Sequence, residues 1–300
     1  KGTSFDYRPS GLIEVFTKQN TFEAARHEIE VMCELGVEIE ELSASQLLEV
    51  EPTLHGVAGG YRLIRDGRLD PSMLLDVVKT EAMAHGAEWV TAVVREIRPT
   101  RDGVNVVTTA GTMAAAQVVV AAGVWTPELV ACLGVRLPVI PAKGYSVTLS
   151  GIQDLPALPL LLIDQRLAVN AMGRGLRITG RYELTTPYDL SIPPSRVKGL
   201  VDLARPVLGL PKNAQPTQPW AGLRPASPDG LPLIGRLSCD ERVLVCVGHG
   251  MLGTASGPGT GEAVAAVMTG EALPFDMTVM SPERFGAINL RDVRRGIWRR

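Results

Sequence analysis

The last third of this 300-residue chain contains an apolar strand pattern, a glycine-rich turn and a helical pattern in direct succession. The run reads VLVCVGHGMLGTASGPGTGEAVAAVM from Val243 to Met268. Glycines in such a turn let a ligand approach the backbone, and the N–H groups at a helix start attract flat or anionic groups. Many strand–turn–helix passages only close a packed βα unit, so the run alone predicts α/β architecture without deciding on a ligand.

A second run, WAGLRPASPDGLPLIG, extends from Trp220 to Gly235 and places Arg224 among glycines and prolines. A rigid backbone can hold a guanidinium group at one place, as bidentate recognition of a carboxylate requires. The alternative is a surface arginine that fastens a loop.

Length and composition exclude several classes of protein. The chain is long enough for one large domain or two intertwined ones. A net charge of -2 and a pI near 6.2 predict no nucleic-acid partner. The apolar stretches are too short or too interrupted by proline to span a bilayer, and no signal-peptide pattern is found.

Four cysteines are scattered without the spacing of a metal site or a disulfide framework: Cys33, Cys132, Cys239 and Cys246. They predict reduced thiols, a cytoplasmic location and no bound metal. The basic tail at residues 291–300 is interpreted as a solvated end, and the alternative is weak attachment to an anionic membrane.

Helical periodicity begins at about Thr21 and stops at Gly36, and it places Phe22, Ala25, Ile29, Met32 and Leu35 on one apolar face. A second, short helix is predicted with Ser43 as its cap, Leu47 and Leu48 facing inward, and Pro52 as its end.

A third helix is predicted after Leu69, with Asp70 or Ser72 as the cap, Pro71 in the first turn and Gly86 at the end. Strands are predicted over residues 88–97, 104–109 and 114–122. The last of these is apolar throughout, as expected of a strand buried on both faces.

From residue 138 the chain changes to frequent prolines and short β-like runs at 144–149, 160–163 and 176–179, with a helix at 194–204. This texture predicts a second, mostly antiparallel domain, inserted before α/β texture returns at Val243. The two domains are therefore expected to be discontinuous in sequence.

Six motifs in colinear order resemble the FAD-dependent D-amino acid oxidase superfamily: DYRPSGLIEVF, GRLDPSMLL, VVVAAGVWTPEL, LPVIPAKGYSVTL, WAGLRPASPDGLPLIGR and GHGMLGTASGPGTG. Within it the chain is most similar to the bacterial D-amino acid dehydrogenase small subunit, with glycine oxidase a near relative. The resemblance implies an α/β fold in which an incomplete FAD-binding Rossmann-like domain (residues 65–136 and 228–272) is interleaved with a mixed-sheet α+β substrate domain (1–64 and 137–227), followed by a tail (273–300).

One expected part of the family pattern is missing. The family opens with a strand and a G-x-G-x-x-G turn whose helix start receives the FAD pyrophosphate, and no such unit stands near the start of this sequence. Gly173 and Gly175 have no helix after them, and the glycines at 257, 259 and 261 come too late in the chain. We therefore expect a family member without its main dinucleotide anchor, through truncation, separate encoding or decay.

The resemblance also implies site residues. Arg224 would hold the substrate carboxylate, and Gly250, Met251, Leu252 and Gly253 would follow the pyrimidine edge of the flavin, with the helix after Gly259 pointing its positive end there. His249 is either an acid/base group or a packed, hydrogen-bonded histidine. Tyr145 either reaches the substrate or belongs to the core, and Lys143 is interpreted as a solvated or loop-tying charge.

Residues implied near the dinucleotide could equally be ordinary core positions. They are Val94, Ala121, Ala122, Gly123, Trp125 and Gly222.

The predicted function is oxidative deamination of a D-amino acid, or of a glycine-like amine acid, to a 2-oxo acid and ammonia. The implied partners are the amino acid and an electron acceptor such as a quinone. Two alternatives stay open. The chain is one subunit of a flavoprotein complex whose partner supplies the nucleotide anchor, or it is a non-catalytic remnant that keeps the fold.

Overall fold

The computed structural model describes residues 5–173, 175–214, 216–273 and 275–286. The chain divides into two units, each assembled from three separate segments. Unit 1 comprises Lys1–Glu88, Gly144–Tyr182 and Leu190–Gly222, and unit 2 comprises Trp89–Lys143, Glu183–Asp189 and Leu223–Arg300. The first segment of unit 1 thus continues past the domain edge proposed after residue 64.

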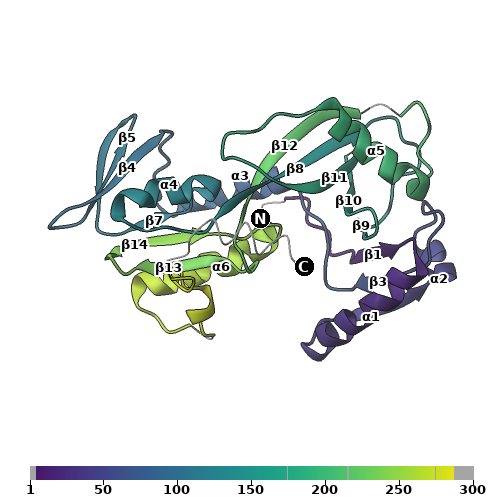
Figure 1. Cartoon of the computed structure of the whole chain (residues 1–300), viewed down its shortest axis with the longest axis horizontal. Coiled ribbons are helices and arrows are strands. Elements are labelled where there is room, and N and C mark those ends of the chain that lie inside the picture. Colours follow the sequence, from purple (N-terminus) through teal and green to yellow (C-terminus); the bar gives the residue numbers. More distant parts are fainter. Residues whose placement is uncertain (1–4, 174, 215, 274, 287–300) are drawn as a thin grey trace. The chain divides into compact units, whose positions relative to one another are not determined.

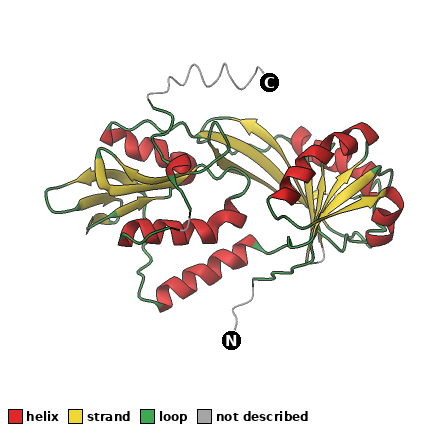
Figure 2. Cartoon of the chain, turned by 90° about the horizontal axis from the view of Figure 1, so that it is seen from below, coloured by secondary structure: helices red, strands yellow, loops and turns green. Residues whose placement is uncertain are grey.

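Unit 1 is built on an eight-stranded sheet with the order β12-β8-β11-β10-β9-β1-β3-β2 (Figure 1). Its strands are β1 (Leu12–Phe16), β2 (Ile39–Ser43), β3 (Gly59–Leu63), β8 (Ile140–Leu149), β9 (Leu160–Leu162), β10 (Leu167–Met172), β11 (Gly175–Leu184) and β12 (Pro216–Ala226). β1 runs antiparallel to β3 and parallel to β9. Figure 2 shows these strands fanned into a twisted sheet with helices beside it.

Apolar residues at alternate strand positions form the main core of unit 1. Val147 and Leu149 on β8, Val169 on β10 and Ile178 on β11 are all buried in this core. It is closed by the apolar face of α5 (Pro194–Leu208), including Leu200. This helix runs one turn beyond its predicted end at residue 204, because Val207 and Leu208 are buried in the core as well.

α1 (Gln19–Glu34) begins directly after two residues that are hydrogen-bonded to the side chain of Asp164. That carboxylate accepts hydrogen bonds from the Thr17 and Lys18 N–H groups at 2.8 and 3.1 Å and from the Thr21 hydroxyl at 2.7 Å. It fixes the two residues before the helix from a distant segment, while no side chain caps α1 itself. The prediction that Leu35 lies on the apolar face is wrong. Leu35 is 80% exposed, because the helix ends one residue before it.

α2 (Ala44–Val50) begins with the predicted Ser43 cap, which forms a reciprocal capping box with Gln46. Leu47 is fully buried, whereas Leu48 is 40% exposed, so the inward orientation predicted for Leu48 is wrong. A short helix presents one face to the core, and adjacent residues cannot both lie on it.

α3 (Pro71–Ala84) has the predicted cap, since Asp70 Oδ1 accepts from the N–H groups of Ser72 and Met73. The predicted stop is also present as Gly86, with a φ of +91°. None of the α3 side chains is buried.

Unit 2 contains two three-stranded sheets. One has the order β13-β14-β7, from β13 (Leu233–Leu237), β14 (Asp240–Val247) and β7 (Val118–Val120), with β14 parallel to β7. The other is the meander β4 (Val94–Pro99), β5 (Val104–Thr108) and β6 (Gly111–Ala115). The helices are α4 (Thr126–Val130) and α6 (Gly253–Thr269), with single 3-10 turns η1 (Gly123–Trp125), η2 (Ala131–Leu133) and η3 (Thr278–Met280).

Two predicted strands are corrected here. The strand expected over 88–97 begins only at Val94. The strand expected over 114–122 is two strands in different sheets, β6 and β7, because the chain turns at Gln117, whose side chain donates to the Met268 carbonyl and accepts from Arg236. Val118 and Val119 are only half-buried, so the prediction that this strand is buried on both faces is wrong.

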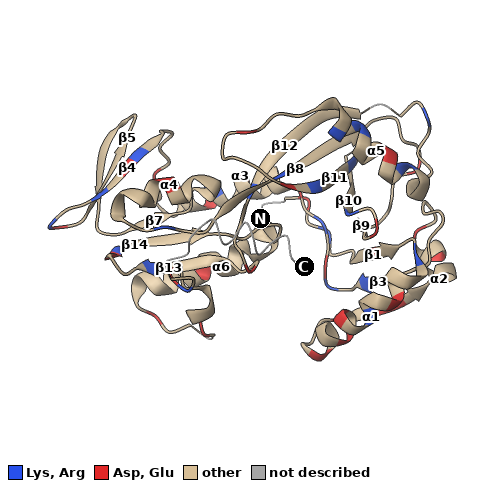
Figure 3. Cartoon of the chain, in the orientation of Figure 1, with Lys and Arg blue, Asp and Glu red and all other residues tan. Residues whose placement is uncertain are grey.

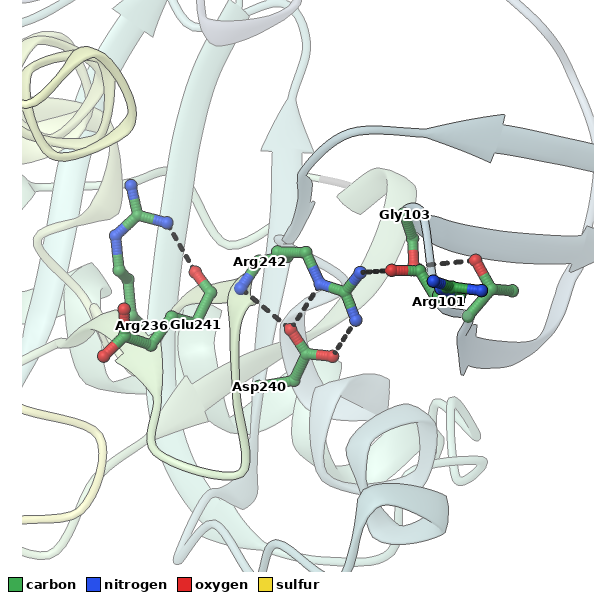
Figure 4. Close-up of polar contacts among 7 residues, drawn as sticks. Arg101, Gly103, Arg236, Asp240, Glu241 and Arg242 are labelled. Carbon is green, nitrogen blue, oxygen red and sulfur yellow. Dashed lines mark hydrogen bonds and ion pairs between the residues drawn. The ribbon is translucent and has the colours of Figure 1, made fainter.

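The β13–β14 hairpin is fixed by arginines (Figure 4). Arg242 donates from Nε and Nη2 to the two carboxylate oxygens of Asp240 at 2.9 and 2.7 Å and reaches the Arg101 carbonyl at 3.5 Å. Arg236 donates to the Glu241 carbonyl. These bonds lock the end of the hairpin that lies away from the turn after β14.

Candidate functional site

Unit 2 contains a cavity of about 430 Å³. It is lined by one stretch of β7, the end of β14, the turn that follows, and one face of α6. Its lining residues are Val119, Ala121, Gly123, Pro225, Cys246, Val247, His249, Gly250, Gly253, Gly257, Thr260, Gly261 and Val264.

The turn after β14 has the geometry that glycine permits. Gly248 and Gly250 have φ values of +90° and +54°, which side chains with a Cβ rarely adopt. Together with Gly253, the first residue of α6, they match the G-x-G-x-x-G spacing directly after a strand and at a helix start. Sequence analysis missed this match. In the described residues no strand follows α6 to carry the acidic residue of a full dinucleotide fingerprint.

α6 presents glycine backbone to the cavity. Gly253, Gly257 and Gly261 stand four residues apart, on one face of the helix. A Cβ at Gly257 or Gly261 would meet no atom within 4 Å. Figure 3 shows how sparsely the helix is charged, with Glu262 its one charged residue. The prediction that this helix begins after Gly259 is wrong, since it begins at Gly253 and its positive end lies at the turn itself.

His249 is fixed on two sides. Its ring Nε2 lies 3.1 Å from the Thr260 hydroxyl, and its backbone pairs with Ala226 in an isolated antiparallel bridge. The next residue, Gly250, donates its N–H to the Pro225 carbonyl at 2.9 Å. Burial lowers the pKa of His249 below its usual 6.5, so the imidazole is neutral near pH 7. This histidine ties the turn to α6 and to the end of β12.

Arg224 is half-buried on β12 and directly precedes Pro225 of the cavity lining. Gly222, two residues earlier, is required for packing: a Cβ there would lie 2.0 Å from Cη2 of Trp220.

Tyr145 is 1% exposed and packs in the unit 1 core. Lys143 is 3% exposed and bonds Asp189 at 2.6 Å, which fastens the segment between β11 and α5.

The structure brings together only some of the predicted cofactor residues. Ala121, Gly123, Gly250 and Gly253 line the cavity. Val94, Ala122, Trp125, Gly222, Met251 and Leu252 are not part of its lining, and Met251 and Leu252 are 73% and 67% exposed.

Several lining residues were missed by sequence analysis, notably Cys246, Thr260 and Val264. Burial raises the pKa of the Cys246 thiol, so it stays protonated near neutral pH. The signal for the α6 residues was the four-residue spacing of Gly253, Gly257 and Gly261, which leads through Thr260 to Val264 on the same face.

The four cysteines are free thiols. Within the described ranges, no group of His, Cys, Asp and Glu is arranged to hold a metal ion. In the same part of the chain no helix is both long and apolar enough to cross a membrane. The basic tail at 291–300 lies outside the described residues.

Comparison with known proteins identifies relatives over most of the chain. The family model described as FAD dependent oxidoreductase (DAO) matches residues 1–267. A D-amino acid dehydrogenase of Cereibacter sphaeroides (strain ATCC 17029 / ATH 2.4.9) is 32% identical over 298 residues, covering 97% of this chain and 68% of the relative. One from Bradyrhizobium diazoefficiens is 30% identical, covering 95% and 69%.

Two solved structures have a similar fold. Glycine oxidase from Geobacillus kaustophilus superposes with a TM-score of 0.88 at 26% identity, over 93% of this chain and 76% of that one. L-proline dehydrogenase from P. horikoshii shares the fold, with a TM-score of 0.85 at 21% identity, over 94% and 78%.

The family's FAD can be tested against the cavity. Backbone at Gly250, Gly257 and Gly261 faces open space that a Cβ would enter, as close approach of a flat ring requires. The first N–H groups of the 17-residue α6 are directed to the same place and favour partial negative charge. These residues fit the flavin portion of the cofactor. On these grounds, and on the match over residues 1–267, the chain belongs to the DAO family of FAD-dependent oxidoreductases.

Proposed function

We propose that this protein oxidises the amine of a D-amino acid, or of a glycine-like amine acid, to a 2-oxo acid and ammonia. The glycine-lined cavity beside the start of α6 is the observation that carries the proposal. The names of two relatives, a D-amino acid dehydrogenase and a glycine oxidase, suggest the substrate class.

FAD, when bound, supplies the chemistry by accepting a hydride from the substrate Cα. The chain's own task is orientation and charge stabilisation. Arg224, with a planar fork of donors, is proposed to hold the α-carboxylate. The α6 N-terminus and the turn at Gly250–Gly253 are proposed to stabilise negative charge on the cofactor ring.

His249 is proposed to act as a neutral positioning group rather than as an acid or base, since its Nε2 is engaged by Thr260. A strong side-chain base is not required if the substrate amine binds neutral. Water then hydrolyses the imino acid. Tyr145 is buried in the unit 1 core. Its proposed contact with the substrate therefore requires the substrate to reach the hydroxyl inside that core.

A second hypothesis is that the chain acts as one subunit of a flavoprotein complex. Its first relatives are about half as long again, since the chain covers 68% of one and 67% of another. In the described residues β7 is an edge strand of its sheet and can accept a further strand.

A non-catalytic remnant is the third hypothesis. Flanking coding sequence with an adjoining G-x-G-x-x-G unit would favour the enzyme, and the electron acceptor is proposed to be a quinone.

The decisive experiment is the visible spectrum of the purified protein with FAD, followed by turnover of D-alanine and glycine with an artificial electron acceptor. Arg224→Ala is expected to lower kcat/KM. The decrease should correspond to a loss of about 2–4 kcal/mol of transition-state stabilisation, as expected when a charge-assisted carboxylate clamp is removed. Arg65→Ala is the control, because Arg65 is an exposed arginine paired with Glu38. An unchanged kcat/KM in Arg224→Ala would exclude the clamp, and a colourless, inactive protein would favour the complex or the remnant.

A further inference from the structure

The unit 1 sheet has a second face with a different chemistry from its core. Val169, Ile178 and Val147 point into the core, so the residues between them point to the opposite face. On that face Arg177 of β11 stands directly across from Asn170 of β10. Ser146 of β8 lies next to them.

Arg177 is held in place by neutral groups. Its Nη2 donates to the Ser146 hydroxyl at 3.1 Å, and its Nη1 lies 3.9 Å from the sulfur of Met172. Ser146 is 2% exposed, so the anchoring hydroxyl is itself fixed in a buried position. The guanidinium is half-buried and keeps most of its five donors for another partner.

Arg68 reaches the same end of β10. It is half-buried, and its Nη1 donates to the Ala171 carbonyl. The guanidinium groups of Arg68 and Arg177 therefore contact two consecutive residues of β10, Ala171 and Met172.

Across the described residues, no Asp or Glu forms an ion pair with either arginine. Other arginines of the chain behave differently: Arg242 and Arg284 each contact both carboxylate oxygens of an aspartate. Partly desolvated cations without an anionic partner are costly, and an anion that binds between them recovers that cost.

We propose that Arg177 and Arg68 form a binding site for the carboxylate of a small organic acid. The planar fork of Arg177 matches a carboxylate in bidentate geometry, and Ser146 restricts its orientation. The amide of Asn170 stands beside the site as a further donor. The site lies within unit 1 and requires neither FAD nor Arg224, so it stands or falls independently of the proposed function.

The test is calorimetric titration of the full chain with malonate, with malonamide as the uncharged probe of the same shape. Malonate is expected to bind and malonamide is not. Arg177→Met should weaken malonate binding by about tenfold or more, the effect of losing charge-assisted hydrogen bonds. Arg177→Lys should retain part of the affinity because it keeps the charge without the fork.

Three variants make the result specific. Arg65→Met removes an exposed positive charge from the same unit and should leave malonate affinity unchanged. Lys198→Met removes a second exposed positive charge of unit 1, paired with Asp202, and should also leave malonate affinity unchanged. Ser146→Ala should weaken binding severalfold through loss of the anchor.

The proposal is overturned if malonamide binds as well as malonate, or if Arg177→Met and Arg65→Met have equal effects. Should Arg177→Met fail to fold, the side-chain Nε–H signal of Arg177 in the wild-type chain decides the matter by NMR. That signal must shift on addition of malonate and not on addition of malonamide.

Discussion

At the scale of single residues, one ion pair has a defined pH dependence. The hydrogen bond from Arg242 lowers the pKa of Asp240 from 3.8 to about 2. The carboxylate therefore contributes stability above pH 4, and this contribution is lost as the pH falls through about 2.

Asp240→Asn should consequently lower stability at pH 6 by about 1 kcal/mol, a figure discounted for solvent screening at the partly exposed Arg242. The difference from wild type should shrink as the pH falls from about 4 to 2. Urea unfolding between pH 2 and 7 measures it, with Asp202→Asn in the exposed Lys198 pair as the control. A difference that is constant with pH would contradict the assignment.

His249 supplies a second residue-scale prediction. Since burial lowers its pKa in the folded chain, its contribution to stability is present above pH 6.5 and is lost as the pH falls through the folded-state value. An NMR titration of the ring should show a midpoint below 6.5, the usual value of a solvated histidine. Thr260→Val should loosen the ring and raise hydrogen exchange at the Gly250 amide. A midpoint at or above 6.5 would exclude the buried, neutral imidazole.

At the scale of elements, the turn after β14 separates two roles of glycine. Gly250 needs its positive φ of +54°, whereas Gly253 begins α6 and is absent from the positive-φ positions. Of these two glycines, only Gly250 has a backbone conformation that disfavours a side chain.

Gly250→Val should therefore cost about 1–2 kcal/mol of folding stability and weaken FAD binding as well. Gly253→Val should leave thermal stability nearly unchanged but fill the cavity, because a Cβ there meets only His249 Cβ at an ordinary 3.5 Å. Gly253→Ala is the matched control. Flavin fluorescence quenching and thermal unfolding measure the two effects, and full flavin occupancy in Gly253→Val would remove the cavity from consideration as the flavin site.

Local signals predicted the elements that depend on neighbours in sequence. The Asp70 and Ser43 caps, the Gly86 stop and the glycine-rich turn were all correctly placed, since caps and turns are decided within a few residues. The break between β6 and β7 was not predictable, because it depends on Gln117 bonding Arg236 and Met268 from segments far away. The cavity was only partly predictable for the same reason: β7, Pro225 and α6 meet through tertiary packing.

At the scale of the whole molecule, α3 is the helix that stands out. None of its side chains is buried, and Leu75 and Val78 are 70% and 57% exposed. Exposed apolar residues that gather on one element favour association with another surface.

Leu75→Lys together with Val78→Lys should reduce self-association while changing unfolding free energy by no more than about 0.5 kcal/mol, as at other exposed positions. Leu47→Lys, at a fully buried site, is the contrasting control and should unfold the chain. Light scattering against concentration, paired with urea unfolding, decides the matter. A large loss of stability in the double variant would show that α3 packs against something in solution.

The pairing of β1 with β9 governs when this protein can fold during synthesis. Ile13 lies beside Leu160, and Thr17 lies 147 positions before Asp164, whose carboxylate accepts its N–H. At a translation rate of about 5–20 residues per second, β1 is made roughly 7–30 s before β9, the strand on its second edge. Throughout that interval Ile13 and Val15, which are 0% exposed in the folded chain, remain in water as a substrate for nascent-chain chaperones.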